Sequence, residues 1–140
     1  MSRLILLSNR APSKHSADSG GLVVALRDLI SARKGIWVGA APKPVRTPAE
    51  SLRFVSHGEF DVGLFDLTRA EHNEYYLGYS NSTLWPVFHG RVDLAVFDSA
   101  FYRTYRKVAR RIARQLHEIM RPDDCIWVHD YHMIPVAHEL

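Results

Sequence analysis

The stretch Ile126-Trp127-Val128-His129-Asp130-Tyr131-His132 decides the fold class of this chain. Three apolar residues give way abruptly to polar and ring-bearing ones. This is the pattern of a buried parallel strand with polar groups at its carboxyl end. Ligands of open α/β sheets bind outside those carboxyl ends. We therefore expect a functional site where this strand ends.

A second strand end of the same kind lies near the N-terminus, where Leu4 to Leu7 is followed by Ser8, Asn9 and Arg10. A polar loop then leads to Gly20-Gly21, which opens a helix with apolar residues at helical spacing. Neighbouring strands of a twisted sheet can place the two polar ends side by side. The sequence thus predicts one site built from both strand ends.

The remaining pattern predicts an α/β fold with a parallel sheet covered by helices, because strands and helices alternate along the chain. Thr68 and Glu71 form the pattern of a capping box, and Asp98-Ser99 starts the longest helix. The expected elements are strands at 36–39, 52–60, 62–67 and 125–128, a helical region from Thr68 through Tyr76, and helices from 98 to about 120 and from Met133 to Leu140.

The long helix carries an apolar face and a basic face. Its apolar positions follow steps of three and four residues, which is typical of a helix packed against a core. The basic face contains Arg103, Arg106, Lys107, Arg110, Arg111 and Arg114. Such a face suits nucleic-acid binding or a solvated helix surface, and the acidic residues elsewhere in the chain favour the second interpretation.

The composition indicates one soluble domain with an ordinary core. The chain has 140 residues, of which 46% are hydrophobic and 24% charged, and a net charge of +3. The single cysteine, Cys125, excludes a disulfide framework within the chain and favours the cytoplasm. We expect no signal peptide and no membrane span, because the longest apolar runs are short.

Three local patterns suggest chemistry, and each has a structural alternative. Gly20-Gly21 at a helix start, with Arg10 nearby, suits an anion, although paired glycines are often purely structural. Tyr75-Tyr76 with Trp85-Pro86 suits a core or a sugar site. The histidines around Asp130 match no standard zinc spacing, so we expect no metal and interpret Asp130 as a carboxylate that orients ligand hydroxyls. The structural alternative is a strand end without a ligand.

Together these segments resemble the trehalose-6-phosphate synthase family, glycosyltransferase family 20. The resemblance covers essentially all 140 residues. The matching motifs are Ser8-Asn9-Arg10-Ala11-Pro12, Gly20-Gly21-Leu22, Trp37-Val38-Gly39, the signature from Glu74 to His89, and Trp127-Val128-His129-Asp130-Tyr131-His132. The last two motifs are specific, so the fold implied is the Rossmann-like N-terminal domain of a two-domain GT-B glycosyltransferase.

The resemblance implies transfer of glucose from UDP-glucose to glucose 6-phosphate, giving trehalose 6-phosphate and UDP. It assigns Arg10, Tyr76 and Trp85 to the phosphate of glucose 6-phosphate and Asp130 to the acceptor hydroxyls as the catalytic carboxylate. It assigns Gly20 and Gly21 to the nucleotide sugar. No cofactor, metal, nucleic acid or membrane is implied, and the full-length protein is a possible homo-oligomer.

By this resemblance, residues 1–140 are an incomplete N-terminal, acceptor-side domain, and the C-terminal donor domain lies outside them. We expect such a fragment to be inactive alone. Two alternatives stay open: a related glycosyltransferase with another acceptor such as glycerol 3-phosphate, and a non-catalytic synthase-like domain that regulates a partner.

Overall fold

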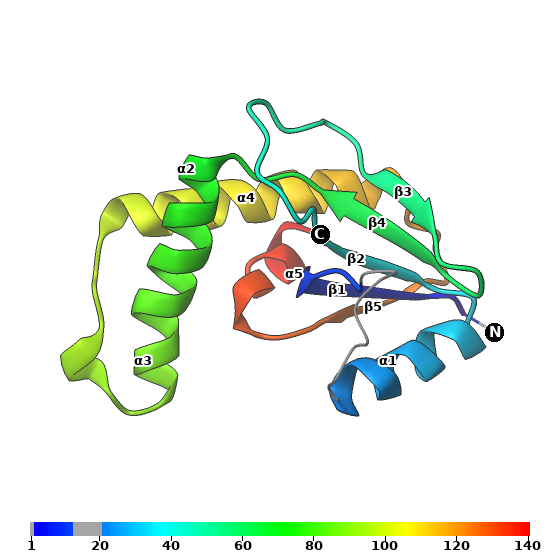
Figure 1. The fold of residues 1–140 in the computed structure, drawn as a ribbon, viewed down its shortest axis with the longest axis horizontal. Coiled ribbons are helices and arrows are strands. Elements are labelled where there is room, and N and C mark those ends of the chain that lie inside the picture. Colours follow the sequence, from blue (N-terminus) through cyan, green and yellow to red (C-terminus); the bar gives the residue numbers. More distant parts are fainter. Residues whose placement is uncertain (1, 13–20) are drawn as a thin grey trace.

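The computed structural model describes residues 2–12 and 21–140, and these form a five-stranded sheet with helices on both faces (Figure 1). The sheet order is β3-β4-β2-β1-β5. The strands are β1 (Leu4–Arg10), β2 (Ile36–Ala40), β3 (Arg53–Ser56), β4 (Asp61–Phe65) and β5 (Cys125–Val128). The helices are α1 (Gly21–Ala32), α2 (Arg69–Glu71), the π-helix η1 (His72–Leu84), α3 (Trp85–Phe88), the 3-10 helix η2 (Val92–Leu94), α4 (Ser99–His117), the 3-10 helix η3 (Tyr131–Met133) and α5 (Val136–Glu139).

The sheet confirms the predicted neighbourhood of the two polar strand ends. β1 pairs in parallel with β5, with Leu7 opposite Val128, and the His129 N–H donates to the Leu7 carbonyl at 2.8 Å. β2 also pairs in parallel with β1 and with β4. β3 runs antiparallel to β4, and the turn near His57-Gly58 joins these two strands. Four strands therefore deliver their carboxyl ends to the same edge of the sheet.

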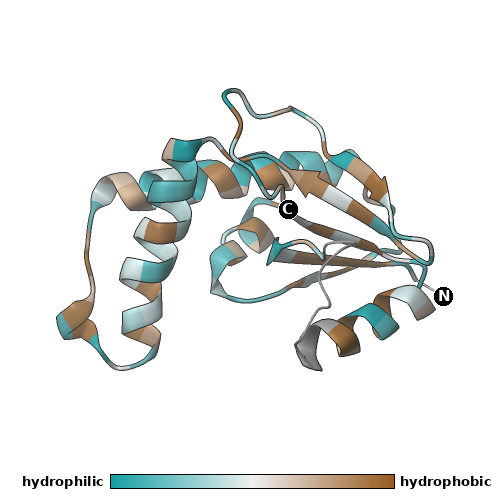
Figure 2. Ribbon diagram, in the orientation of Figure 1, coloured by the Kyte–Doolittle hydropathy of each residue, from teal (hydrophilic) through white to brown (hydrophobic). Residues whose placement is uncertain are grey.

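Alternate residues of β1 enter two separate cores, as the two-residue period of a strand requires. Ile5 and Leu7 pack on the side covered by α4 and η1, whereas Leu6 packs with α1. Figure 2 shows the hydrophobic strands enclosed between these helices. The α4 side also buries Val38, Phe65, Tyr75, Val108, Ile112 and Leu116, and the α1 side buries Leu26, Ile30, Trp37 and Val62.

The strand predicted at 125–128 is present as β5 and has one neighbouring strand among the described residues. It is the last strand of the sheet there and pairs with β1, and 42% of Trp127 is exposed. The burial of β5 depends on which strands lie beside it, which its own apolar sequence does not give.

Helix α4 confirms the predicted start and apolar face. The Asp98 side chain accepts from the Ala100 N–H at 2.7 Å, and Val108, Ile112 and Leu116 are fully buried. The opposite, basic face is largely paired with carboxylates: Arg106 and Arg110 with Glu139, and Arg111 and Lys107 with Glu71. These pairs account for many of its charges through contacts within the fold.

The predicted capping box at Thr68 is present and joins α2 to α4. The Thr68 hydroxyl accepts from the Glu71 N–H, and the Glu71 carboxylate accepts from the Thr68 N–H, each at 3.1 Å. Burial of Glu71 acts to raise its pKa, but hydrogen bonds from Arg111 and Thr68 outweigh it, and the pKa lies below its usual value. The carboxylate is therefore ionised and fixed.

The helical region extends well beyond its predicted end at Tyr76. From His72 to Leu84 its turns close with i→i−5 hydrogen bonds, and the Ser80 and Ser82 hydroxyls donate to the carbonyls five residues earlier at 2.9 and 2.7 Å. Glycine, serine and threonine are weak α-helix formers. The segment also contains Gly78, whose missing Cβ would lie 2.8 Å from the Phe101 ring. Close packing on α4 therefore fixes this wide helix.

The last predicted helix is shorter than expected. Residues 131–133 form a 3-10 turn, and the α-helix begins only at Val136, after Pro135. Proline lacks an N–H and fixes φ, so it suits the start of a helix.

Loss of the buried Ser80 hydroxyl tests the π-helix. Ser80→Ala should lower the free energy of unfolding by about 1 kcal/mol, because a buried hydrogen bond to the Tyr75 carbonyl is lost. Ser82→Ala is the matched control, since its equivalent bond to Leu77 is exposed, and should cost less than about half as much. Urea denaturation measures both. Equal losses would contradict the role assigned to Ser80.

Candidate functional site

The carboxyl end of β1 is fixed by hydrogen bonds of four side chains. The Trp37 indole N–H donates to the buried Ser8 hydroxyl at 2.8 Å, and that hydroxyl donates to the Arg10 carbonyl at 2.7 Å. The Tyr75 hydroxyl donates to Asn9 Oδ1 at 2.9 Å. These bonds join the strand end to β2 and to the π-helix, and they leave the exposed Arg10 side chain free to face a ligand.

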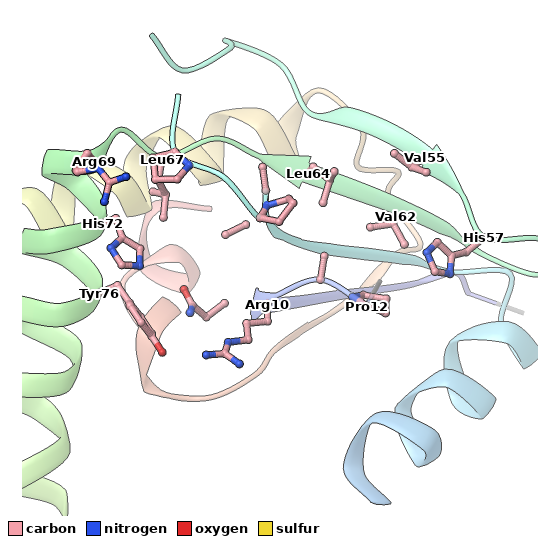
Figure 3. A pocket seen from close by; sticks show the side chains of 16 residues that line it. Arg10, Pro12, Val55, His57, Val62, Leu64, Leu67, Arg69, His72 and Tyr76 are labelled. Carbon is pink, nitrogen blue, oxygen red and sulfur yellow. The ribbon is translucent and has the colours of Figure 1, made fainter. Parts of the chain in front are cut away.

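A cavity of about 620 Å³ opens at this end of the sheet. Figure 3 shows Arg10, Arg69, His72 and Tyr76 at one end of it, and Pro12 and the strand residues at the other. The first end is polar and comes from β1, α2 and the π-helix. The other end is mainly apolar and is lined by Pro12, Val55, Val62 and Leu64, together with His57.

The charges around the cavity suit an anion. Arg10, Arg69, His57 and His72 line it, and the lining has no Asp or Glu among the described residues. Arginine presents a planar set of N–H donors that matches a phosphate or carboxylate. The Tyr76 ring adds a neutral hydroxyl donor and contacts the His72 ring at 5.2 Å between centroids. A phosphate placed near Tyr76 would meet donors of both kinds.

The π-helix places Tyr76 and Trp85 on the same side. The two residues are nine positions apart. In an α-helix each residue rotates by about 100°, so they would point in opposite directions. The wider turns of a π-helix rotate each residue by about 80°, so nine positions complete about two full turns. Asn81 lies between them, and its Oδ1 accepts from the Tyr131 hydroxyl at 3.3 Å, which confirms that this side faces η3.

Asp130, at the end of β5, has a strained backbone. Its φ of 70° and ψ of 171° lie in a region that is essentially restricted to glycine. One carboxylate oxygen accepts from the Tyr131 N–H at 2.8 Å, and 46% of the side chain remains exposed. This conformation turns the chain sharply from the strand into η3 and presents the carboxylate at the edge of the sheet.

Two rings of η3 connect the parts of the site. The His132 ring stacks on Tyr76 at 5.6 Å and on Tyr131 at 4.2 Å between centroids. Tyr131 in turn contacts the Trp85 ring at 5.9 Å. Its backbone carbonyl accepts from the Tyr105 hydroxyl on α4 at 2.6 Å. The π-helix and the end of β5 are thus held against each other through aromatic contacts.

The structure brings the predicted acceptor residues to one edge of the sheet, but not into one cavity. Arg10 and Tyr76 line the cavity, whereas Asp130 and Trp85 adjoin it through His132 and Tyr131. Gly21 is the first residue of α1, and Gly20 lies outside the described residues.

Sequence reasoning missed several residues of this edge. Arg69 lies within the capping box and His72 follows it directly. His72 precedes Tyr76 by one turn, so helical spacing was the available signal. His132 was considered only as a metal ligand. Asn9 belongs to the predicted polar strand end, whereas Asn81 gave no signal of its own, because single amides are common at helix ends.

Neither a metal site nor a membrane-spanning helix is found in the described part of the chain. No group of three or more His, Cys, Asp or Glu side chains there is arranged to hold a metal ion. Likewise, none of the helices at 21–140 is long and apolar enough to cross a bilayer.

Comparison with known families identifies the chain. The model of glycosyltransferase family 20 matches residues 3–140. The chain belongs to this family. This match confirms the family resemblance that the sequence motifs indicated.

Characterised family 20 proteins share both sequence and fold with it. The trehalose-6-phosphate synthase of Klebsiella pneumoniae is 37% identical over 142 residues, which cover 100% of this chain and 30% of that protein. The UDP-forming α,α-trehalose-phosphate synthase of Burkholderia vietnamiensis superposes with a TM-score of 0.93 at 44% identity, covering 99% of this chain and 30% of that one. The Burkholderia xenovorans enzyme, solved with glucose-6-phosphate, gives 0.84 at 37% identity, covering 98% and 30%.

These superpositions confirm the predicted fold class, the Rossmann-like α/β domain of a GT-B glycosyltransferase. The chain spans about 30% of the length of the curated relatives it matches.

The strain at Asp130 predicts an unusual effect of glycine. Asp130→Ala and Asp130→Gly both lose the hydrogen bond to the Tyr131 N–H, but only glycine relieves the backbone. Relief of about 1–3 kcal/mol exceeds the conformational entropy cost of glycine, about 0.5–1 kcal/mol. Asp130→Gly should therefore unfold at higher urea concentration than Asp130→Ala. The reverse order would show that Asp130 is not strained.

Proposed function

We propose that the gene product carrying these residues transfers glucose from UDP-glucose to glucose 6-phosphate, which yields trehalose 6-phosphate and UDP. The observation that carries the proposal is the cation-lined cavity beside Tyr76, with the Asp130 carboxylate at the same sheet edge. Family 20 membership supports it. A relative solved with glucose-6-phosphate further supports a sugar phosphate as acceptor.

The chemistry divides between the two ends of the acceptor. Arg10 binds the phosphate by charge-assisted hydrogen bonds, and Tyr76 and Trp85 add neutral N–H and O–H donors. Asp130 accepts a hydrogen bond from a sugar hydroxyl and so orients the acceptor. An acceptor oxygen forms the bond to the anomeric carbon as the bond to the diphosphate breaks, and the hydroxyl proton passes to the leaving diphosphate. This front-face route retains the configuration of the anomeric carbon and needs no protein nucleophile.

We assign residues 1–140 to the acceptor-side, N-terminal domain. The donor contacts that this chain supplies are the backbone N–H groups of Gly20 and Gly21, where a helix start suits an anionic group. The charge that develops on the leaving diphosphate requires cations outside these residues. Such a division assigns acceptor choice to this chain and donor choice to the remainder of the enzyme.

Removal of the Arg10 guanidinium tests the acceptor assignment. A hydrogen bond to a charged group is worth about 1.5–3 kcal/mol, so Arg10→Ala should raise the KM for glucose 6-phosphate by about tenfold or more. The KM for UDP-glucose should change by less than about twofold. Arg114→Ala, which removes an exposed arginine of α4, is the control and should change neither constant. Equal effects of Arg10→Ala on both substrates would contradict an acceptor-phosphate role.

Binding by residues 1–140 alone tests the domain assignment. We expect this chain to bind glucose 6-phosphate in a titration followed by NMR, with shifts at Arg10 and Tyr76, and to release no UDP from UDP-glucose. Glycerol 3-phosphate serves as the competing acceptor and should bind more weakly, because it lacks the sugar hydroxyls that Asp130 would orient. Turnover by this chain alone, or tighter binding of glycerol 3-phosphate, would overturn the assignment.

A further inference from the structure

The proposed function assigns no task to His132, although its ring joins two parts of the site. The ring lies between Tyr131 and Tyr76, at interplanar angles of 26° and 27°. Only 11% of the side chain is exposed. The His132 ring therefore joins Tyr76, on the π-helix, to the carboxyl end of β5.

The imidazole is close to Asp130 but not bonded to it. The buried Nδ1 atom of His132 lies 4.0 Å from the Asp130 carboxylate and has no hydrogen-bond partner among the described residues. This distance is too long for a hydrogen bond. Among the described residues, the Tyr131 N–H alone is hydrogen-bonded to the carboxylate, so within that part of the chain the remaining acceptor positions of Asp130 stay available for a ligand.

The groups around His132 keep its ring neutral. Burial lowers its pKa below the usual 6.5 and is the largest effect, and the charges of His129 and Arg10 act in the same direction. Asp130 opposes them. The Tyr76 and Tyr131 rings also face the imidazole. The folded protein therefore binds this proton only as the pH falls below the usual histidine value.

We propose that His132 is a positioning residue for the acceptor, with opposite effects in its two protonation states. As a neutral ring it holds Tyr76 in place and leaves the Asp130 carboxylate free for a sugar hydroxyl. As a cation, 4.0 Å away, it becomes the ion-pair partner of that carboxylate and competes with the acceptor. This inference rests on the proposed function, because it takes Tyr76 and Asp130 as acceptor contacts.

The first experiment needs no enzymatic activity. The imidazole signals of residues 1–140 are followed by NMR from about pH 8 to pH 5. We expect His132 to titrate below the usual histidine value of 6.5, and the Tyr131 amide signal to move with His132, because that N–H reports on the Asp130 carboxylate. Titration of His132 at or above that value would overturn the proposal.

The second experiment separates the ring from its nitrogen atoms. In the gene product carrying this chain, His132→Phe keeps the stacking and should leave the KM for glucose 6-phosphate within about twofold at pH 7.5. His132→Ala removes the stacking and should raise that KM by about three- to tenfold, with a smaller effect on kcat. His138→Ala is the control for loss of a histidine. A large loss in His132→Phe, or none in His132→Ala, would overturn the positioning role.

The pH dependence of KM completes the test. The acceptor phosphate itself titrates near pH 6, so wild type and His132→Phe are compared at each pH. The KM of wild type divided by the KM of His132→Phe should rise by about threefold or more as the pH falls from 7.5 to about 5. The reason is that only wild type can form the ion pair with Asp130. A constant ratio would overturn the proposal. Absence of transfer at every pH would instead refute the proposed function, while the NMR titration would still decide the inference.

Discussion

The site depends on the wide winding of residues 72–84. Because each turn closes over five residues, Tyr76, Asn81 and Trp85 lie along one side of the π-helix and meet η3 together. The same segment wound as an α-helix would turn Trp85 away from the end of β5. The alignment is thus a property of the backbone hydrogen bonds rather than of any single side chain.

Such a helix persists only where its surroundings favour it. Here the side opposite the site packs on α4, where Tyr75 and Tyr79 contact the Tyr105 ring at 6.0 and 4.6 Å between centroids. Gly78 allows Phe101 to approach closely. The Tyr75 hydroxyl also reaches Asn9, so the packing that fixes the winding also fixes the end of β1. Core and site are therefore stabilised by the same contacts.

Much of this architecture was predictable from the sequence. The β1 and β5 strands, the cap at Asp98 and the capping box at Thr68 each have local signals, and all were placed correctly. The burial of β5 was not predictable from its own residues, because it depends on which strands lie beside it. Nor was the π-helix, since its hydrogen-bond pattern arises from packing on α4. The neighbourhood of Arg10 and Asp130 followed from topology alone, whereas the contribution of His132 required coordinates.

The separation of charge across the site has a consequence for how a ligand enters. Arg10 and Arg69 lie on the cavity side, and the Asp130 carboxylate lies at the end of β5. The site is in effect an electric dipole. Under the proposed function, a molecule with a phosphate at one end and only hydroxyls at the other would be turned into its bound orientation before it makes contact. A sugar bisphosphate would place its second phosphate against Asp130, and the site would reject it by repulsion.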